Sequence, residues 1–345
     1  MLNGLMCRSP MTEPPKTAPA GVPASERDLL LATKLHVPGR QPGFVPRPRL
    51  ARALDEGLAR GLVLVCAPAG SGKTALLADW ARSGDRAVAW LSLDAGDNDP
   101  VRFWRHAVAA LDRARPGISG QVSAFLSPPA PRSFEGLVTA LINELAARPD
   151  QAGTVLVLDD YQLLDAAQVH ASVEFLVGQR PPGLGVVLTS RSDPPLPLAR
   201  LRANGQLAEL RAADLRFTDQ EAAALLHAAV GDDLPGEAAA ALAARTEGWA
   251  AGLQLAALSL RGRADVAGFV AAFSGSHRYV LDYLAQEVLD RQEEQLRRFL
   301  LDTSVLERLS GGLCDAVTGR ADGQEMLEQI ERSGLFLVPL DEVRG

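Results

Sequence analysis

The 345-residue sequence predicts an α/β fold in which a parallel β-sheet covered by helices is followed by a mainly helical second half. In the first half, short apolar runs without polar alternation are separated by helical stretches, which is typical of parallel strands buried on both faces. Beyond about Phe217 the strand pattern fades and alanine-rich helical periodicity continues. The predicted strands are Leu62–Ala67, Val88–Leu93, Val155–Leu158 and Val186–Thr189.

Composition limits the function. A hydrophobic content of 47% supplies enough apolar material for two or three domains with their own cores. The net charge of −7 argues against a general nucleic-acid binder, which needs a basic face. No apolar run is long enough to span a bilayer, and no signal peptide is apparent, so we expect a cytoplasmic protein without a membrane partner.

The N-terminal segment lacks the pattern of a folded element. Residues 1–28 are rich in Pro, Ala, Ser and Thr without apolar periodicity, which predicts a disordered leader, and Met11 is an alternative start to Met1. Four prolines between Leu29 and Leu50 favour an extended lead-in over a helix.

Helices are predicted between and after the strands from their caps. One follows the first strand and runs through Arg82. The sequence Asn98-Asp99-Pro100 supplies the cap and first turn of a second helix. Ser133 opens a third, and Thr218 with an acidic first turn opens the first helix of the second half.

The first strand leads into a phosphate-binding loop. Residues 67–74 fit the pattern G-x-x-x-x-G-K-[ST], except that Ala67 replaces the first glycine. The glycines let successive backbone N–H groups face one anion, the lysine reaches the β- and γ-phosphates, and the threonine hydroxyl ligates Mg²⁺. A turn that merely contains Gly-Lys-Thr is disfavoured because a strand and a helix flank the loop. The predicted nucleotide-binding residues here are Ala67, Pro68, Ala69, Gly70, Ser71, Gly72, Lys73 and Thr74.

Two acids follow the third predicted strand, where ligands bind in open α/β sheets. We assign Asp159, with Thr74, to the magnesium shell, and Asp160 to polarising the attacking water. A helix N-cap or solvated turn residue is the alternative for Asp160.

Other charged residues also lie at strand ends. Arg191 follows the fourth predicted strand and can deliver a cation towards the γ-phosphate, with a plain surface salt bridge as the alternative. For Asp94, Asp97 and Asp99 we favour capping and solvation over metal binding, because the spacing lacks the remainder of a calcium loop.

In this order the motifs resemble the N-terminal ATPase region of MalT-like large LuxR-family regulators, within the STAND class of signalling NTPases. The resemblance covers nearly everything after Leu29. The residues that carry it are Thr33-Lys34-Leu35, Val45-Pro46-Arg47, Ala67 to Thr74, Trp90 to Asp94, Asp97 to Pro100, Leu158 to Tyr161, Thr189 to Arg191, Leu215 to Thr218, Gly248 to Leu253 and Phe299 to Val305.

The resemblance implies an AAA+/STAND-like P-loop NTPase core at residues 29–216, a helical domain at 217–285 and a partial winged-helix domain at 286–345. ATP or ADP and Mg²⁺ would be the cofactors, and the ATP state would self-associate. By the same similarity Arg47 would lie near the adenine or ribose, and the turn Gly248–Leu253 would close over the nucleotide.

The chain ends at Gly345, inside the implied winged-helix domain. The family's inducer-binding repeats and C-terminal DNA-binding domain would lie beyond this point, so we expect no DNA-binding element in this chain.

The function that we predict is an ATP-binding signal-transduction switch, an ATPase that hydrolyses ATP slowly and has a regulatory role. A P-loop kinase-type metabolic enzyme is one alternative, for which Asp160 is the sole candidate base. A degenerate, non-functional regulator fragment is the other.

Overall fold

The computed structural model describes residues 30–40, 43–126, 133–148, 153–231, 234–261, 263, 265–273, 278–306, 308–333 and 335. The predicted leader and both candidate start methionines lie outside these residues, as do residues 336–345 of the implied winged-helix domain.

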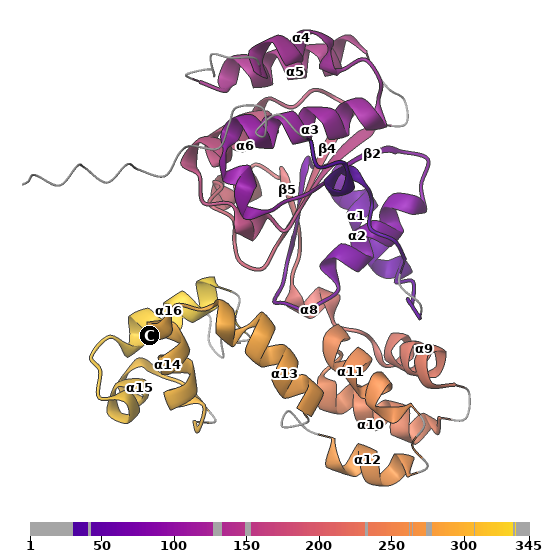
Figure 1. Ribbon diagram of the computed structural model, residues 1–345, viewed down its shortest axis with the longest axis vertical. Helices are drawn as coiled ribbons and strands as arrows, with labels where there is room; N and C mark the ends of the chain where they lie inside the picture. The colour runs from indigo at the N-terminus through magenta and orange to yellow at the C-terminus, as the bar shows by residue number, and fades with distance from the viewer. Residues whose placement is uncertain are drawn as a thin grey trace, which may run out of the picture. The chain divides into compact units, whose positions relative to one another are not determined.

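The first half of the chain builds a five-stranded parallel sheet in the order β2-β3-β4-β1-β5 (Figure 1). The α/β prediction is therefore confirmed. The strands are β1 (Leu62–Cys66), β2 (Ala87–Ser92), β3 (Thr154–Asp159), β4 (Leu184–Ser190) and β5 (Leu207–Leu210).

The register brings the predicted site to one edge of the sheet. Cys66 at the end of β1 lies opposite Ser190 of β4, and Leu158 of β3 lies opposite Leu188 of the same strand. Because all strands are parallel, their carboxyl ends meet at this edge. β4 lies between the strand that leads into the phosphate loop and the strand that ends at Asp159.

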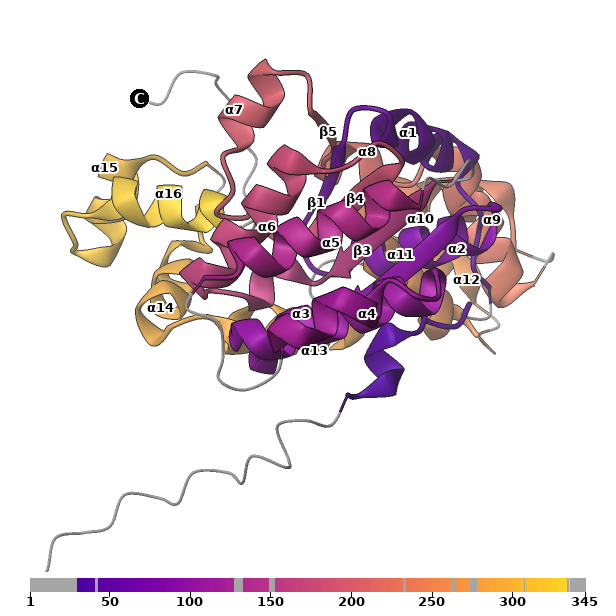
Figure 2. The same ribbon diagram turned by 90° about the horizontal axis from the view of Figure 1, so that it is seen from above.

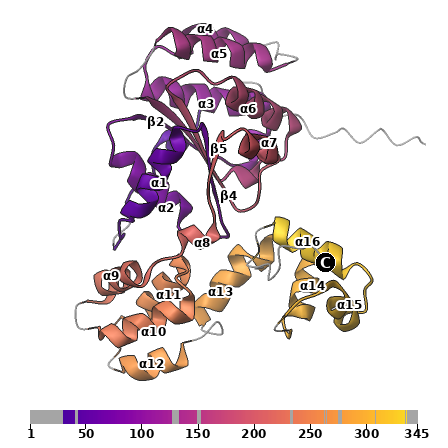
Figure 3. The same cartoon turned by 180° about the vertical axis from the view of Figure 1, so that it is seen from behind.

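Helices cover both faces of the sheet, as Figures 2 and 3 show. α1 and α2 contribute Leu54, Leu77 and Trp80 to the core on one face. The helices of this half are α1 (Pro48–Leu58), α2 (Lys73–Arg82), α3 (Pro100–Ala114), α4 (Ser119–Val122), α5 (Glu135–Ala147), α6 (Ala167–Gln179), α7 (Leu198–Ala203) and α8 (Ala212–Leu215), with 3-10 turns η1 (Ala32–Leu35), η2 (Ala95–Asn98), η3 (Ser123–Leu126) and η4 (Tyr161–Leu163).

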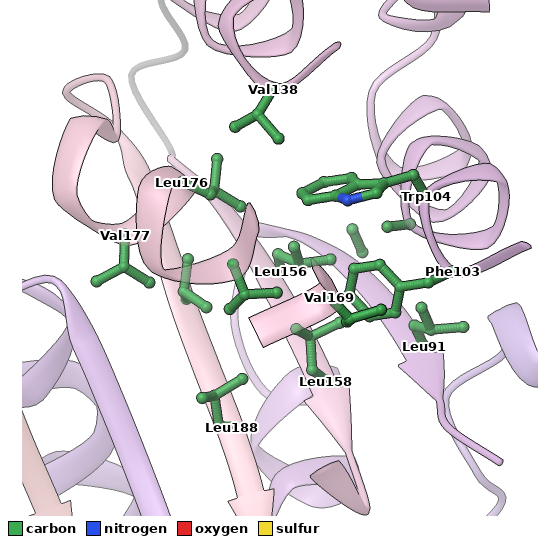
Figure 4. Packing of buried hydrophobic residues seen from close by; sticks show 14 of the residues in the cluster. Leu91, Phe103, Trp104, Val138, Leu156, Leu158, Val169, Leu176, Val177 and Leu188 are labelled. Carbon is green, nitrogen blue, oxygen red and sulfur yellow. The ribbon is translucent and has the colours of Figure 1, made fainter. Parts of the chain in front are cut away.

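The core on the other face is formed by α3, α5 and α6 against the strands (Figure 4). Phe103 and Trp104 of α3 are fully buried and meet edge to face, with ring centroids 5.2 Å apart. They pack with Leu156 and Leu158 of β3 in one cluster. Burial of strand residues from both sides explains why the strands read as continuous apolar runs.

The described part of the chain after Phe217 is helical, as predicted. One core joins α9 to α13 and a smaller one joins α14 to α16. These helices are α9 (Asp219–Val230), α10 (Gly236–Thr246), α11 (Ala250–Leu260), α12 (Val266–Ala272), α13 (Arg278–Glu287), α14 (Glu294–Thr303), α15 (Gly311–Thr318) and α16 (Gly323–Arg332), with the 3-10 turn η5 (Leu289–Arg291).

The prediction of an extended lead-in is wrong at two places. Ala32–Leu35 forms η1, and Pro48 occupies the first turn of α1. A proline is compatible with that position because the N–H that it lacks would have no partner inside the helix. The edge strand β5 was not predicted, because four residues with a polar Glu209 do not form an apolar run.

The prediction that the acidic cluster is solvated is wrong for one of its residues. Asp94 caps η2 and Asp99 caps α3, as expected. Asp97 is fully buried and forms an ion pair with the buried Lys34, and its Oδ1 lies 3.0 Å from Nδ1 of His106. A buried charge needs such partners, so this carboxylate fixes η1 and α3 to the end of β2.

Candidate functional site

The loop between β1 and α2 has the backbone that its glycines allow. Gly70 and Gly72 have φ angles of 71° and 81°, in the left-handed region. A Cβ atom on Gly70 would lie 2.6 Å from Cβ of Ala251 and 2.7 Å from the hydroxyl of Tyr283. This position therefore needs glycine both for its conformation and for the close approach of α11 and α13.

Lys73 begins α2 and is buried. Its Nζ donates hydrogen bonds to the carbonyl oxygens of Ala67 (2.7 Å) and Pro68 (3.0 Å). Burial lowers the pKa of Lys73 to about 8, and the nearby Asp160 opposes part of this effect. The ammonium is thus held at the loop by two carbonyl groups, where an anion would be a stronger partner.

The buried carboxylate of Asp159 is the centre of a hydroxyl cluster. Thr74 Oγ1 donates to its Oδ1 at 3.0 Å, and Thr189 Oγ1 donates to the same atom at 2.7 Å. Burial raises the pKa of Asp159 to about 6, although the hydrogen bond from Thr189 acts in the opposite direction. The three side chains come from α2, β3 and β4, so the register of the sheet brings them together.

Asp160 has a left-handed backbone, with φ 63° and ψ 45°. It immediately precedes η4, and its side chain makes no cap hydrogen bond. Of the alternative considered for Asp160, the geometry thus shows a half-buried turn position without a side-chain cap. Its backbone N–H donates to Thr189 Oγ1 at 2.8 Å, and its Oδ1 accepts from Nε2 of Gln162 at 2.9 Å. A non-glycine residue in this conformation is often part of a functional site.

Arg191 follows β4 and lines the same cavity as the loop. Its Nη1 donates to the backbone oxygen of Glu287 and its Nη2 pairs with Oε2 of the same residue, both at 3.1 Å. The two side chains are 27% and 32% exposed. The salt bridge that we considered as an alternative is therefore present, but it is partly buried and it lies at the cavity.

Arg47 lies beneath the loop. Its Nη1 donates to the carbonyl oxygen of Leu215 at 2.9 Å, its Nη2 donates to that of Gly72 at 3.4 Å, and its guanidinium lies over the ring of Phe217. Burial lowers the pKa of Arg47 to about 10. These contacts tie the start of α1 to the loop, and the placement of Arg47 near the adenine or ribose stays a prediction.

A cavity of about 510 Å³ adjoins these residues, within the range of small-molecule sites. Segments from both halves of the chain surround it. Trp249 Nε1 donates to the carbonyl of Ala69 at 3.2 Å, and Ala251 N donates to that of Gly70 at 2.9 Å. The lining includes residues 38–40, 43–45 and 47, residues 69–75, Asp160, Arg191, Phe217, Ala250, Ala251, Gln254 and Tyr283.

The structure brings the predicted site residues to the cavity or to the strand ends beside it, but several further contributors were not predicted from the sequence. Phe44 and Tyr283 line the cavity, and Gln162 bonds to Asp160. The glycines and prolines around residues 38–43 could have indicated a loop near the ligand. Nothing in the local sequence around Gln162 or Tyr283 shows what these side chains meet.

Two family models match the chain. Residues 47–189 match the AAA ATPase domain, and residues 285–345 match the MalT winged helix domain. The chain is 38% identical over 320 residues to the serine/threonine-protein kinase PknK of Mycobacterium tuberculosis (strain ATCC 25618 / H37Rv), covering 92% of this chain and 29% of PknK. It is 36% identical over 318 residues to the HTH-type transcriptional regulator MalT of Klebsiella pneumoniae (strain 342), covering 91% of this chain and 35% of MalT.

A solved structure has the same fold. The Walker-type ATPase PABY2304 of Pyrococcus abyssi superposes with a TM-score of 0.56 at 14% identity, over 85% of this chain and 91% of that one. The parallel sheet and the glycine loop thus define a P-loop ATPase of the AAA class. Within that class, the chain fits the N-terminal ATPase region of MalT-like regulators. It spans about a third of the length of the curated relatives that it matches.

A search of the described helices for one long and apolar enough to span a bilayer finds none.

Proposed function

We propose that this chain is a nucleotide-dependent switch that binds ATP or ADP with Mg²⁺, hydrolyses ATP slowly and so transmits a signal within a MalT-like transcriptional regulator. One observation carries the proposal. The phosphate loop, Asp160 and Arg191 line one cavity, and residues of α11 and α13 line it as well. A nucleotide there would contact both halves of the chain, so its γ-phosphate can change how they interact.

The phosphates are assigned to the loop residues 67–74. Lys73 would exchange its two loop carbonyls for the β- and γ-phosphates. Thr74 and Asp159 would hold Mg²⁺, which takes oxygen ligands. The fit to this ion is supported by the contact between the two side chains, whose oxygens already lie 3.0 Å apart. When bound, the ion neutralises phosphate charge.

Asp160 and Arg191 are assigned to hydrolysis. Asp160 would accept a hydrogen bond from the attacking water and so orient it towards the γ-phosphorus. Arg191 would stabilise the charge on the γ-phosphate oxygens. Turnover by these residues resets the switch, because hydrolysis removes the group that Arg191 recognises.

The signal is proposed to pass from the nucleotide-binding domain (residues 29–216) through the helical domain (217–285) to the winged-helix domain (286–345). Arg191 binds Glu287 at the end of α13. ATP would compete for this arginine with its γ-phosphate, whereas ADP would not. We further propose that the ATP state self-associates and that longer relatives contact DNA through parts outside this chain.

A kinase-type activity has less support. PknK is named a serine/threonine-protein kinase, but the chain covers only 29% of it. Among the described residues that line the cavity, the carboxylates are Asp79 and Asp160, and Asp79 pairs with Arg40. A kinase site would leave Asp160 as the base for the acceptor. The degenerate-fragment alternative is opposed by the phosphate loop, which keeps Gly70, Gly72, Lys73 and Thr74 of the motif.

The first experiment identifies by mass spectrometry any nucleotide that co-purifies with the native protein, followed by ATP and ADP titration of the emptied protein. We expect bound ADP and measurable affinity for both nucleotides. Lys73→Ala should weaken binding by at least about a hundredfold, because it removes a charge-assisted contact to phosphate. Arg52→Ala, on the exposed side of α1, is the control. Normal ATP affinity in Lys73→Ala would contradict the site assignment.

Hydrolysis is tested separately with Asp160→Asn. We expect this variant to bind ATP normally and to hydrolyse it at least about tenfold more slowly. An unchanged rate would remove Asp160 from its proposed role. Phosphorylation of an added small-molecule acceptor, with phosphate transferred in proportion to ATP consumed, would favour the kinase alternative instead.

A further inference from the structure

The side chain of Gln162 bridges two residues of the proposed hydrolytic site. It lies in η4, just after Asp160. Its Nε2 is 2.9 Å from Oδ1 of Asp160, and its Oε1 is 3.0 Å from the backbone nitrogen of Arg191. One planar amide thus joins the end of β3 to the residue that follows β4.

The orientation of this amide follows from its partners. A backbone N–H can only donate, so the group that faces Arg191 must be the carbonyl oxygen of Gln162. The NH₂ group then faces Asp160, whose carboxylate accepts the hydrogen bond. Both ends of the side chain are matched, and reversing the amide would break both bonds.

Asp160 depends on such support. Its left-handed backbone conformation is unfavourable for a residue with a Cβ atom. The backbone is held by the bond from Asp160 N to Thr189 Oγ1, but that bond does not fix the carboxylate. Among the hydrogen bonds that the structure describes for this carboxylate, the one from Gln162 sets its direction.

We propose that Gln162 is a positioning residue for ATP hydrolysis. Its amide holds the carboxylate of Asp160 at a fixed place relative to the backbone of Arg191. The proposal rests on the hydrolytic role assigned above to Asp160. The amide donor restricts Oδ1 and leaves Oδ2 for the water. Because the other end of the amide is bonded to the backbone N–H of Arg191, it ties the water-orienting carboxylate to the backbone at the end of β4.

The test compares kcat and KM for ATP in the wild-type chain and in Gln162→Met, which has a similar length but neither amide group. We expect kcat to fall about tenfold with KM within about twofold, because a misplaced base slows the chemical step without removing phosphate contacts. Gln168→Met, on the exposed face of α6, is the matched control and should leave kcat unchanged.

A double-mutant cycle separates positioning from general structural damage. If Gln162 acts through Asp160, Gln162→Met should have no further effect on kcat in the Asp160→Asn background. An equal loss of kcat in both backgrounds would overturn the proposal. Gln162→Glu keeps the acceptor for Arg191 but loses the donor to Asp160, so it should be impaired at least as much as Gln162→Met. Wild-type kcat in Gln162→Glu would also overturn it.

The outcomes distinguish this proposal from the proposed function. Absence of hydrolysis in the wild-type chain would overturn both. Hydrolysis that Asp160→Asn impairs but Gln162→Met leaves unchanged would overturn the positioning role alone. Thermal unfolding of each variant accompanies the kinetics, so a loss of folded protein is not mistaken for a loss of kcat.

Discussion

At the scale of single residues, we expect Lys73 to couple nucleotide binding to pH. Burial at the loop removes water from its ammonium group, which explains why its pKa falls from 10.5 to about 8. Phosphate charges next to the ammonium would raise this pKa again. Binding should therefore be accompanied by uptake of a proton at alkaline pH.

We predict that titration of Lys73 leaves the ATP affinity nearly constant below about pH 7. Above about pH 8 the affinity should fall by up to tenfold per pH unit. Calorimetric titration from pH 7.0 to 9.5, in buffers of different ionisation enthalpy, measures the affinity and the proton uptake together. Lys73→Arg, whose guanidinium stays protonated, should lose the dependence. A flat wild-type profile would mean that Lys73 is charged in the empty site.

Burial shifts the pKa of Asp159 in the opposite direction from that of Lys73. Its pKa in the folded chain, about 6, lies above its ordinary value of 3.8 because the carboxylate is buried. The folded state holds the proton more tightly between these values, so the contribution of Asp159 to stability falls as pH rises from about 4 to about 6. At neutral pH the buried charge destabilises the protein without nucleotide.

We therefore predict that Asp159→Asn stabilises the nucleotide-free protein by about 1–3 kcal/mol at pH 7.5, and that the gain shrinks towards zero near pH 4. The amide oxygen of asparagine can still accept from Thr74 and Thr189. Urea unfolding at pH 4.5 and 7.5 measures the difference, and the exposed Asp85→Asn is the control. A destabilised variant at pH 7.5 would show that the charge is better compensated than burial suggests.

The sequence could predict the loop residues because glycine, lysine and threonine at fixed spacing form a site from one continuous segment. It could predict Asp159 and Asp160 because they directly follow a buried strand. Gln162 could not be found in the same way. One of its two partners, Arg191, lies beside it only because β3 and β4 are neighbours in the sheet. The residues next to Gln162 in the sequence do not predict that strand pairing.

At the scale of elements, the turn between α10 and α11 packs directly on the segment before α9. Phe217 N donates to the carbonyl of Gly248 at 2.8 Å. Gly248 has a φ of 69°, and a Cβ atom there would lie 2.4 Å from the carbonyl oxygen of Phe217. The same turn leads to Trp249, which bonds to the phosphate loop.

We predict that Gly248→Ala destabilises the protein by about 2–4 kcal/mol, since it adds a clash with the backbone to an unfavourable conformation. Gly205→Ala is a matched control, because Gly205 has a φ of 68° but open space around its Cβ position. It should cost only about 1 kcal/mol. Equal losses in chemical unfolding would indicate that the turn near Gly248 can move away from Phe217.

Elements differ in how far local sequence determines them. The central strands β1, β3 and β4 could be predicted because burial on both faces favours continuous apolar runs, and β2, at one edge of the sheet, also contains such a run. β5 could not be predicted because its four residues include the half-buried Ala208 and the charged, half-buried Glu209, and so form no apolar run. The start of α1 could not be predicted from the prolines, because proline usually breaks a helix. Pro48 lies in the first turn, where a helix tolerates it.

At the scale of the whole molecule, the ion pair between Arg191 and Glu287 links the sheet to the segment that matches the MalT winged helix domain. If ATP competes for Arg191, weakening its present partner should favour ATP over ADP. We predict that Glu287→Gln raises ATP affinity about two- to fivefold and changes ADP affinity by less than about twofold, because a neutral acceptor holds arginine less strongly.

Parallel titrations of ATP and ADP in the presence of Mg²⁺ measure this discrimination. Glu294→Gln is the control, because its side chain is 86% exposed and its contact to Arg297 is 4.0 Å long. Equal gains for ATP and ADP would show that Glu287 restrains the cavity as a whole and does not act through the γ-phosphate.

The strand order also has a consequence for synthesis on the ribosome. β1 is made first among the strands, yet its hydrogen-bonded neighbours are β4 and β5, which are made last. Pairings between such distant segments form slowly, because the intervening chain must be ordered first. The phosphate loop therefore acquires its supporting strands only after Leu210 has been translated. Until then, we expect the apolar β1 segment of the nascent chain to be exposed to aggregation.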